Sequence, residues 1–224
     1  MKRFILYGFY TLLIVIVGSA FAFKVFQPVQ VLPRIRLAPG FALIDQAGER
    51  LTNEDLRSQF TLYDFGYTRC GPACDLSNRS MREIQGRLDE LALGDIPVTL
   101  VTISFDPEYD TPERLQAYAE SVGADPARWR FATVADPSRL KYIIGGGFET
   151  YYEAQDDGSF AFDPAFVLVD GWGIIRGEYR YQTMASDSER IMRHLEVLAD
   201  EVINSKGSAS VAYEAAHYFL CYAP

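Results

Sequence analysis

Cysteine and histidine are both scarce in this sequence. Its 224 residues contain three cysteines, Cys70, Cys74 and Cys221, and two histidines, His194 and His217. Three cysteines are too few to build a scaffold from several disulfides. The sequence also lacks a His-Glu-x-x-His motif and a Ser-His-Asp set, so it carries no signature of a zinc peptidase or a serine hydrolase. The closely spaced pair Cys70 and Cys74 is therefore the main candidate for a reactive or metal-binding site.

Positive charge is scarce as well. The chain has 21 Lys and Arg against 30 Asp and Glu, which gives a formal net charge of -9. Because residues 1–24 contain three cations and no acid, the rest of the chain carries -12. No basic stretch is interleaved with aromatics, and an acidic surface repels phosphate backbones, so we expect no nucleic-acid partner. There is no internal repeat, and 49% hydrophobic residues suffice for one packed domain.

One long apolar run lies at the N-terminus. Residues 4–23 are almost wholly apolar and uncharged, and they follow Lys2 and Arg3. A helix of this length reaches across a hydrocarbon core of about 30 Å. Since cations in front of a span stay in the cytoplasm, we predict one N-terminal span in the inner (cytoplasmic) membrane, with the remaining chain facing the periplasm or outer side. A cleaved signal peptide ending near Ala20-Phe21-Ala22 is the alternative, but its apolar part is usually only about 7–15 residues.

The sequence beyond this anchor (residues 1–24) divides into a tether, one domain and a tail. Residues 25–40 contain three prolines and no hydrophobic period, which is typical of an extended tether. The domain spans residues 41–204, and the tail, residues 205–224, begins with a Gly/Ser linker and ends rich in aromatics. We predict strands at 41–44, 61–67, 98–105, 130–134, 160–169 and 173–180, and helices at 74–91, from 110, at 137–144 and up to about 204.

The order of these segments predicts the fold class. Strands that alternate with helices favour an α/β fold with a central, mostly parallel sheet and flanking helices, closed by an antiparallel hairpin. A thioredoxin-like fold has this order. The triple glycine at 145–147 is predicted to stop the helix before it, because no lysine or helix start follows that would suit a phosphate loop.

The segment Cys70-Gly71-Pro72-Ala73-Cys74 lies where a predicted strand ends and a predicted helix begins. Free N–H groups and the helix dipole stabilise a thiolate there and lower its pKa below the free value of about 8.5. A thiolate is both the nucleophile of disulfide exchange and a ligand for a soft metal ion. The two sulfurs could thus form a disulfide or hold one Cu(I). Two structural cysteines without chemistry are the alternative.

Three motifs resemble the SCO/SenC family of copper-handling, thioredoxin-fold proteins that act in cytochrome c oxidase assembly. Tyr67-Thr68-Arg69-Cys70 with Cys74 is similar to its aromatic-Thr-x-Cys-x-x-x-Cys signature, and SFDPEYDTPE at 104–113 is similar to its S-x-D-P-x-x-D-T-P segment. Trp129-Arg130-Phe131 matches its aromatic strand start, and the likeness covers residues 41–202. It implies Cys70 and Cys74 as copper ligands and redox thiols, with the copper-site subunit of cytochrome c oxidase and other periplasmic redox or copper proteins as partners.

The resemblance fails at one position. Family members add a histidine to the two cysteines, eight residues before an aspartate that corresponds to Asp170, and this count reaches Phe162. Two thiolates without imidazole suit Cu(I) and hold Cu(II) poorly. The sequence therefore predicts Cu(I) binding through Cys70 and Cys74, with disulfide exchange gaining importance.

Several residues are candidates to replace that histidine or to shape the site. Asp163 is adjacent to the vacant position, and Asp106 matches a family acid near the cysteines, although a turn or cap explains it equally well. Pro164 is either a cis proline facing the cysteines, as in thioredoxins, or only the start of an edge strand. The remaining candidate ligands are Met184, His194, and His217 with Cys221 in the tail.

Three functional hypotheses follow. The leading one is an anchored assembly factor in which Cys70, at the exposed strand end, is the attacking thiolate and Cys74 the resolving thiol, or in which both deliver Cu(I). The second is a general exported thiol-disulfide oxidoreductase or redox sensor without a copper role. The third is a scaffold with a permanent structural disulfide.

Overall fold

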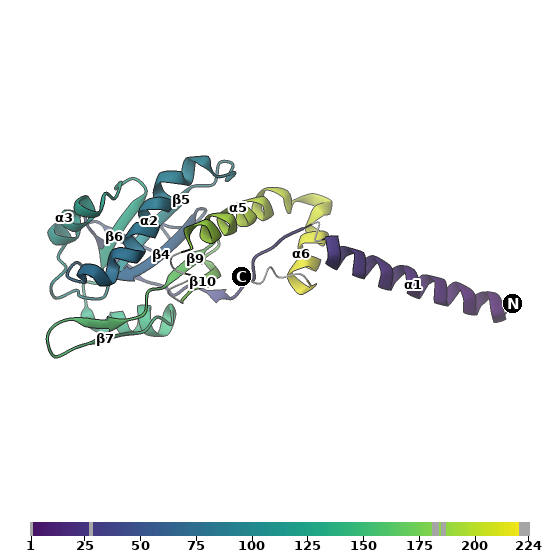
Figure 1. The fold of residues 1–224 in the computed structure, drawn as a ribbon, viewed down its shortest axis with the longest axis horizontal. Coiled ribbons are helices and arrows are strands. Elements are labelled where there is room, and N and C mark those ends of the chain that lie inside the picture. The colour runs from purple at the N-terminus through teal and green to yellow at the C-terminus, as the bar shows by residue number, and fades with distance from the viewer. Residues whose placement is uncertain (1, 27–28, 181–183, 185–186, 220–224) are drawn as a thin grey trace. The chain divides into compact units, whose positions relative to one another are not determined.

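The computed structural model describes residues 2–26, 29–180, 184 and 187–219, and its chain divides into two compact units (Figure 1). Unit 1 consists of residues 1–33 and 201–224, and unit 2 of residues 34–200. Unit 2 contains the whole sheet and both cysteines of the predicted site. Cys221, one of the candidate ligands, lies outside the described residues.

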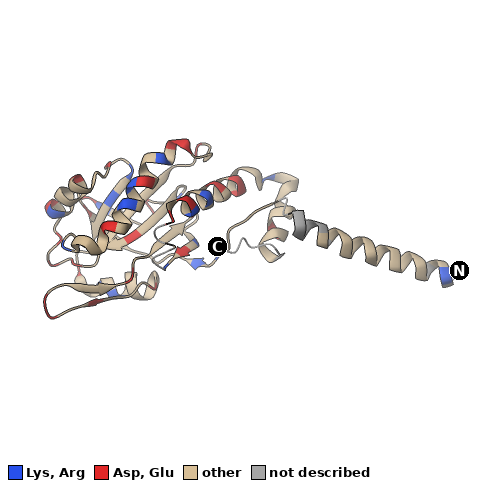
Figure 2. Cartoon of the chain, viewed as in Figure 1, with Lys and Arg blue, Asp and Glu red and all other residues tan. Residues whose placement is uncertain are grey.

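Unit 1 holds two helices, α1 (Lys2–Phe26) and α6 (Ser210–Phe219). The segment predicted as a linker and tail thus contains a helix, and the side chains of Tyr213 and Ala216 on α6 pack against Val31. Figure 2 shows no charged residue along the described middle part of α1. Among the residues that the structure describes, no helix is both long enough and apolar enough to cross a membrane. The N-terminal span stays a prediction.

Unit 2 is built on an eight-stranded sheet. Its strands in spatial order are β1 (Arg36–Leu37), β10 (Ile174–Tyr179), β9 (Phe166–Val169), β4 (Phe60–Gly66), β5 (Val98–Ser104), β6 (Trp129–Thr133), β2 (Ala42–Asp45) and β3 (Arg50–Thr52). Among the strand pairs of the described residues, only β4–β5 and β5–β6 are parallel. The prediction of a mostly parallel sheet is therefore wrong: the hairpins β2–β3 and β9–β10 join its two sides antiparallel, which makes the sheet mixed.

Three helices cover one face of this sheet: α2 (Asp75–Arg87), α3 (Pro112–Val122) and α5 (Ser188–Asn204). α2 and α5 lie side by side (Figure 1), and Ser188 Oγ donates to Glu83 Oε2 across 2.6 Å. Crossovers between parallel strands are right-handed, so the helices after β4 and β5 fall on the same face. The motif Asp-Thr-Pro-Glu starts α3 as predicted, with Thr111 as the N-cap that accepts from Arg114 N.

The opposite face is covered by a π-helix, Lys141–Gly147, and the residue after it. The ring centroid of Phe148 lies 4.8 Å from that of Tyr63 and 5.2 Å from that of Phe65. The glycines at 145–147 form the last part of this helix instead of following it, which corrects their predicted role as a stop. A Cβ at Gly147 would overlap the ring of Pro39, and this close approach explains the glycine.

The structure departs from prediction at two further places. The predicted strand 160–169 is two strands: β8 (Phe160–Phe162), which pairs with β7 (Tyr152–Ala154) in a separate two-stranded sheet, and β9 in the main sheet. Asp163, Pro164 and Ala165 connect them, so the chain changes from one sheet to the other at the Asp-Pro step inside the predicted strand. Arg36 and Leu37, within the predicted tether, form the edge strand β1 against β10.

Candidate functional site

Cys70 and Cys74 form a disulfide with their Cα atoms 5.7 Å apart. β4 ends at Gly66, and a short 3-10 helix, Gly71–Cys74, leads directly into α2. Pro72 restricts this turn and Gly71 adopts φ 52°, a left-handed conformation that glycine adopts without a steric penalty. The predicted location at a strand-to-helix turn is correct.

The disulfide is less accessible than predicted. Cys70 is 7% exposed and Cys74 3% exposed, whereas Cys70 was expected at an exposed strand end. Residues 71–73 between them are exposed, so the turn itself meets solvent while the sulfurs lie beneath it. Direct access of a partner to the two cysteines is therefore limited.

Tyr118 of α3 contacts the sulfur of Cys70. Its hydroxyl lies 3.6 Å from Cys70 Sγ and accepts a 2.8 Å hydrogen bond from Asn78 Nδ2 on α2. Because a disulfide sulfur carries no proton, the tyrosine O–H is the donor toward it. Burial raises the pKa of Tyr118, so the hydroxyl keeps its proton at neutral pH. The same O–H is placed to stabilise a Cys70 thiolate after reduction.

Cys74 packs closely on β4. Its Sγ lies 4.0 Å from the carbonyl oxygen of Tyr67, and a Cβ built on Gly66 would be only 3.0 Å from the same sulfur. Gly66 thus leaves the space that Cys74 occupies, and any larger residue would push the disulfide off the strand.

Asp110 holds the segment in front of Cys70 in place. It is fully buried and accepts from Thr68 N (3.0 Å), Thr68 Oγ1 (2.5 Å) and Ser104 Oγ (2.5 Å). Three donors satisfy a buried carboxylate that would otherwise be costly to desolvate. The first and second motifs of the resemblance therefore meet in space, and Asp110, which sequence reasoning did not single out, joins them.

Asp106 pairs with the residue that precedes the cysteine. Its Oδ2 accepts from Arg69 Nε at 3.1 Å, and the Arg69 guanidinium lies 4.1 Å from the ring centroid of Tyr109. The backbone of Asp106 also serves a turn, because its carbonyl accepts from Asp110 N at 2.8 Å. The interpretation of Asp106 as a turn former is thus confirmed, and its carboxylate pairs with Arg69, so an influence on the cysteines stays a prediction.

A group of aromatic rings covers the turn from the side of the small sheet. Phe160 and Phe162 of β8 lie 5.1 and 6.1 Å, centroid to centroid, from Tyr67, and each lies 5.1 Å from Phe105. Tyr152 of β7 stacks on Phe105 at 5.4 Å. The position that would hold the copper histidine of the family, Phe162, is therefore a packing residue of this aromatic group.

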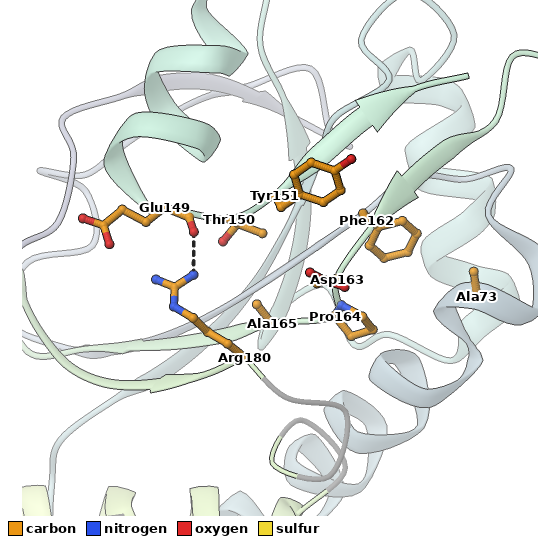
Figure 3. Close-up of a pocket in the computed structure, with 9 residues that line it drawn as sticks. All are labelled: Ala73, Glu149, Thr150, Tyr151, Phe162, Asp163, Pro164, Ala165 and Arg180. Atoms are coloured by element: carbon orange, nitrogen blue, oxygen red, sulfur yellow. Dashed lines mark hydrogen bonds between the residues drawn. The ribbon is translucent and has the colours of Figure 1, made fainter. Parts of the chain in front are cut away.

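Phe162 also lines a pocket of about 530 Å³ next to the cysteine turn (Figure 3). Ala73, Asp163 and Pro164 line it with Phe162, and Arg180 lies across the pocket, where its Nη1 donates to the Glu149 carbonyl at 2.7 Å. The structure contains no cis peptide bond among the described residues, so Pro164 is trans. Both interpretations are wrong: Pro164 is not cis, and it lies just before β9, which is an interior strand between β10 and β4 and not an edge strand.

His194, His217 and Met184 form no metal site with other residues that the structure describes. His194 is buried, with its Nδ1 2.6 Å from the Tyr179 hydroxyl, and burial lowers its pKa to about 4. His217 is bonded to Glu201 at 3.0 Å within unit 1. Met184 precedes α5, where its carbonyl accepts from Asp187 N. Within the described ranges, no group of three or more His, Cys, Asp or Glu side chains could hold a metal ion.

Asp64 is a buried acid that sequence reasoning also missed. It lies on β4, is 1% exposed, and burial raises its pKa to about 7. Thr102 Oγ1, itself the acceptor of Trp129 Nε1 at 2.9 Å, is 3.4 Å from Asp64 Oδ2. The signal in the sequence is a single charge within the strand 61–67, six residues before Cys70.

The sheet order and the disulfide at the β4–α2 turn define a thioredoxin-like domain. Residues 30–200 match the SCO1/SenC family model, and the chain belongs to this family. A putative copper-binding protein of Stutzerimonas stutzeri is 27% identical over 164 residues, covering 73% of this chain and 79% of that protein.

Solved structures agree with this assignment. Bradyrhizobium japonicum ScoI with copper bound is 28% identical, with a TM-score of 0.51 and coverage of 69% of this chain and 98% of that one. BsSco, a member of the Sco family of cytochrome c oxidase assembly proteins in which a disulfide switch was identified, has a TM-score of 0.65 at 21% identity. This match covers 75% of this chain and 96% of BsSco, and it supports the fold.

Proposed function

We propose that this protein is a membrane-anchored SCO-type assembly factor whose Cys70–Cys74 dithiol serves the maturation of the cytochrome c oxidase copper site, by Cu(I) delivery, thiol-disulfide exchange or both. The observation that carries the proposal is the disulfide at the β4–α2 turn, with Tyr118 against one sulfur. It is supported by relatives named as copper-binding and as cytochrome c oxidase assembly proteins.

Thiol-disulfide exchange would prepare the target's cysteines for copper. In the reduced protein, the Cys70 thiolate attacks one sulfur of the target disulfide and the other target sulfur leaves as a thiolate. Cys74 then attacks Cys70 in the mixed disulfide, which releases the second target thiolate and forms the Cys70–Cys74 bond. Two electrons pass from this protein to the target, so a further thiol reductant must restore the dithiol.

Copper enters this scheme as cargo. After reduction, Cys70 and Cys74 supply two thiolates at a spacing already short enough for a disulfide, and thiolates are the ligands that Cu(I) prefers. The ring of Phe162 cannot supply a third ligand. The donor set thus fits Cu(I) and fits Cu(II) poorly, which sets this chain apart from family members with the histidine.

The test is a titration of the reduced full chain with Cu(I) and Cu(II), beside Phe162→His and a matched control, Phe160→His. Both phenylalanines lie on β8 and contact Tyr67, but only Phe162 lines the pocket with Ala73. We expect Cu(I) binding in all three proteins and a gain of Cu(II) affinity only in Phe162→His. Tight Cu(II) binding by the wild type would refute the two-thiolate site.

A general exported thiol-disulfide oxidoreductase is the second candidate. It is favoured by one observation, the aromatic ring of Phe162 in place of an imidazole. Failure of the reduced protein to bind Cu(I), together with rapid exchange with small disulfides, would establish this alternative. A reduction potential below about -300 mV would instead indicate a structural disulfide.

The proposed anchor is the apolar run 4–23. It rests on the sequence and on the exposure of apolar side chains of α1, such as Ile14 at 68% and Phe21 at 70%. Retention in the membrane fraction after alkaline extraction, with the domain open to protease from the periplasmic side, is the expected result. Release of the chain by alkali would contradict it.

A further inference from the structure

Trp172 is an exposed tryptophan on the turn that joins β9 to β10. Its side chain is 61% exposed, whereas Trp129, the second tryptophan of the chain, is fully buried. A single exposed apolar side chain is common on protein surfaces. Trp172 differs from that common case because its backbone is fixed by hydrogen bonds and because other exposed apolar side chains lie next to it.

Asp170 and Arg57 fix the backbone of this turn from two sides. Asp170 Oδ1 accepts from Trp172 N and from Ile174 N, each at 3.0 Å, and Asp170 N donates to the Ile174 carbonyl at 2.9 Å. The guanidinium of Arg57 donates to the Trp172 carbonyl. The backbone that carries the indole is therefore ordered in advance, which lowers the entropy cost of a contact made through it.

Two further exposed apolar side chains lie beside the indole, at the edge of the sheet. Leu37 of β1 is 70% exposed and Ile35 is 41% exposed, and residues two apart in an extended chain point to the same side. Ala38 N donates to the Gly173 carbonyl at 2.9 Å, which joins this edge directly to the turn. Trp172, Leu37 and Ile35 are called the edge patch below.

The chain enters unit 2 at the edge patch. Unit 2 begins at Arg34, one residue before Ile35, and α1 ends at Phe26. Ile35 follows Phe26 by nine residues, and a fully extended chain of that length spans at most about 30 Å. For the anchor proposed above, the edge patch is thus the part of the domain that lies nearest to the bilayer along the chain.

The headgroup region of a bilayer fits these side chains. Tryptophan is enriched at membrane–water interfaces, where its apolar ring and its polar N–H each find a matching environment. Three exposed side chains fall far short of the roughly 800 Å² per partner that a stable protein interface buries, so they fit a lipid surface better than a second protein. Arg57 beside the indole is balanced by Glu54 at 3.3 Å, so we expect zwitterionic lipid to suffice.

We propose that the edge patch rests in the headgroup region of the bilayer that holds α1. This inference rests on the anchor in the proposed function. Gly171 O accepts from Ser58 N at 3.0 Å, two residues before β4 begins at Phe60, so the edge patch lies at the start of β4. The cysteine turn follows the other end of β4, whose length is roughly 20 Å. Contact of the edge patch with lipid therefore turns the Cys70–Cys74 disulfide away from the membrane, toward a partner in the aqueous phase.

The test uses the full chain in phosphatidylcholine vesicles with and without bromine atoms on the acyl chains, which quench the emission of a tryptophan that they contact. The emission of Trp172 is the difference between wild type and Trp172→Phe, which keeps the buried Trp129. The matched control is Tyr142→Trp combined with Trp172→Phe. Tyr142 is 78% exposed and lines a hollow with Asp136, which follows β6 at the cysteine end of the sheet.

We expect bromolipid to remove at least about half of the Trp172 emission, because interfacial side chains lie about 5–10 Å into the boundary between headgroups and acyl chains. The indole introduced by Tyr142→Trp should keep its emission. Leu37→Ser leaves both native tryptophans in place and should weaken the quenching of the total emission, which provides a second test if Trp172→Phe does not fold. Unchanged quenching in Leu37→Ser would count against the edge patch.

Flotation of the vesicles reports on the anchor separately. A chain that floats with unquenched Trp172 emission would overturn this proposal and leave the anchor standing, and a chain that does not float would end both. Equal quenching of Trp172 and of the Tyr142→Trp indole would show adsorption without a preferred face and would also overturn it. Emission of Trp172 that shifts to shorter wavelength without bromolipid quenching would assign the edge patch to a second copy of this chain instead of lipid.

Discussion

Replacing Asp110 by alanine should destabilise the domain and loosen the segment that precedes Cys70. The carboxylate accepts three hydrogen bonds, two from Thr68 and one from Ser104, and is fully buried. Each buried donor left without a partner costs about 1–3 kcal/mol. Thr68 is half-buried and regains water in part, whereas Ser104 is buried, so we expect a loss of about 3 kcal/mol.

Urea unfolding of the oxidised full chain measures this loss. With a slope of about 2 kcal/mol per molar urea, the midpoint should fall by about 1.5 M. Asp157→Ala is the matched control, because Asp157 also accepts from an N–H and an O–H, both of Ser159, but is exposed. Its midpoint should change by less than about 0.5 M. Equal effects of the two substitutions would refute the argument that burial makes Asp110 important.

Three further substitutions test the site and the packing around it. Tyr118→Phe removes the hydroxyl 3.6 Å from Cys70 Sγ, so the thiol pKa of Cys70 in the reduced protein should rise. Alkylation of Cys70 at pH 7 should then slow by roughly three- to tenfold. An unchanged alkylation rate would show that the hydroxyl does not stabilise the thiolate. The pKa of His194 is about 4 in the folded protein and about 6.5 in the unfolded chain. The wild type therefore keeps the full contribution of the neutral imidazole above pH 6.5 and loses roughly 2–3 kcal/mol of stability as the pH falls toward 4. His194→Gln should not show this loss. Urea midpoints at pH 5 and 7.5 measure this loss. An equal change in midpoint between the two pH values in wild type and His194→Gln would contradict the prediction. Gly147→Ala should lower the folding stability by about 1–3 kcal/mol, because a Cβ there overlaps the ring of Pro39. Gly145→Ala, where the space is open, should be neutral or stabilising. Thermal unfolding distinguishes the two variants, and similar unfolding midpoints would contradict the predicted overlap.

The strand-and-helix order was predictable because each element carries its own local signal. The β-branched run of β5 and the Thr111-Pro112 start of α3 lie within a few residues of their predicted bounds. The break between β8 and β9 was not predictable in this way. The segment 160–169 is apolar on both sides of Asp163-Pro164, and this dipeptide alone does not show that pairing with other strands sends the two halves to different sheets.

The sequence likewise did not determine whether neighbouring strands of the sheet run parallel or antiparallel. Alternation of strands and helices favours parallel pairs, but antiparallel pairings outnumber the parallel ones in the described part of this sheet. The direction in which a hairpin adds to the sheet depends on which edge strand offers free N–H and C=O groups. This is a property of the assembled sheet.

The sequence by itself determined the cysteine pair, its place at the start of a helix, the family likeness and the absence of a histidine near Phe162, because all of these are matters of residue type and spacing. Tertiary structure alone decided that Asp110 accepts hydrogen bonds from Thr68, that Tyr118 reaches Cys70, and that Asp64 is buried beside Thr102. The physical reason is that hydrogen bonding and desolvation depend on neighbours in space, and these neighbours come from segments tens of residues apart.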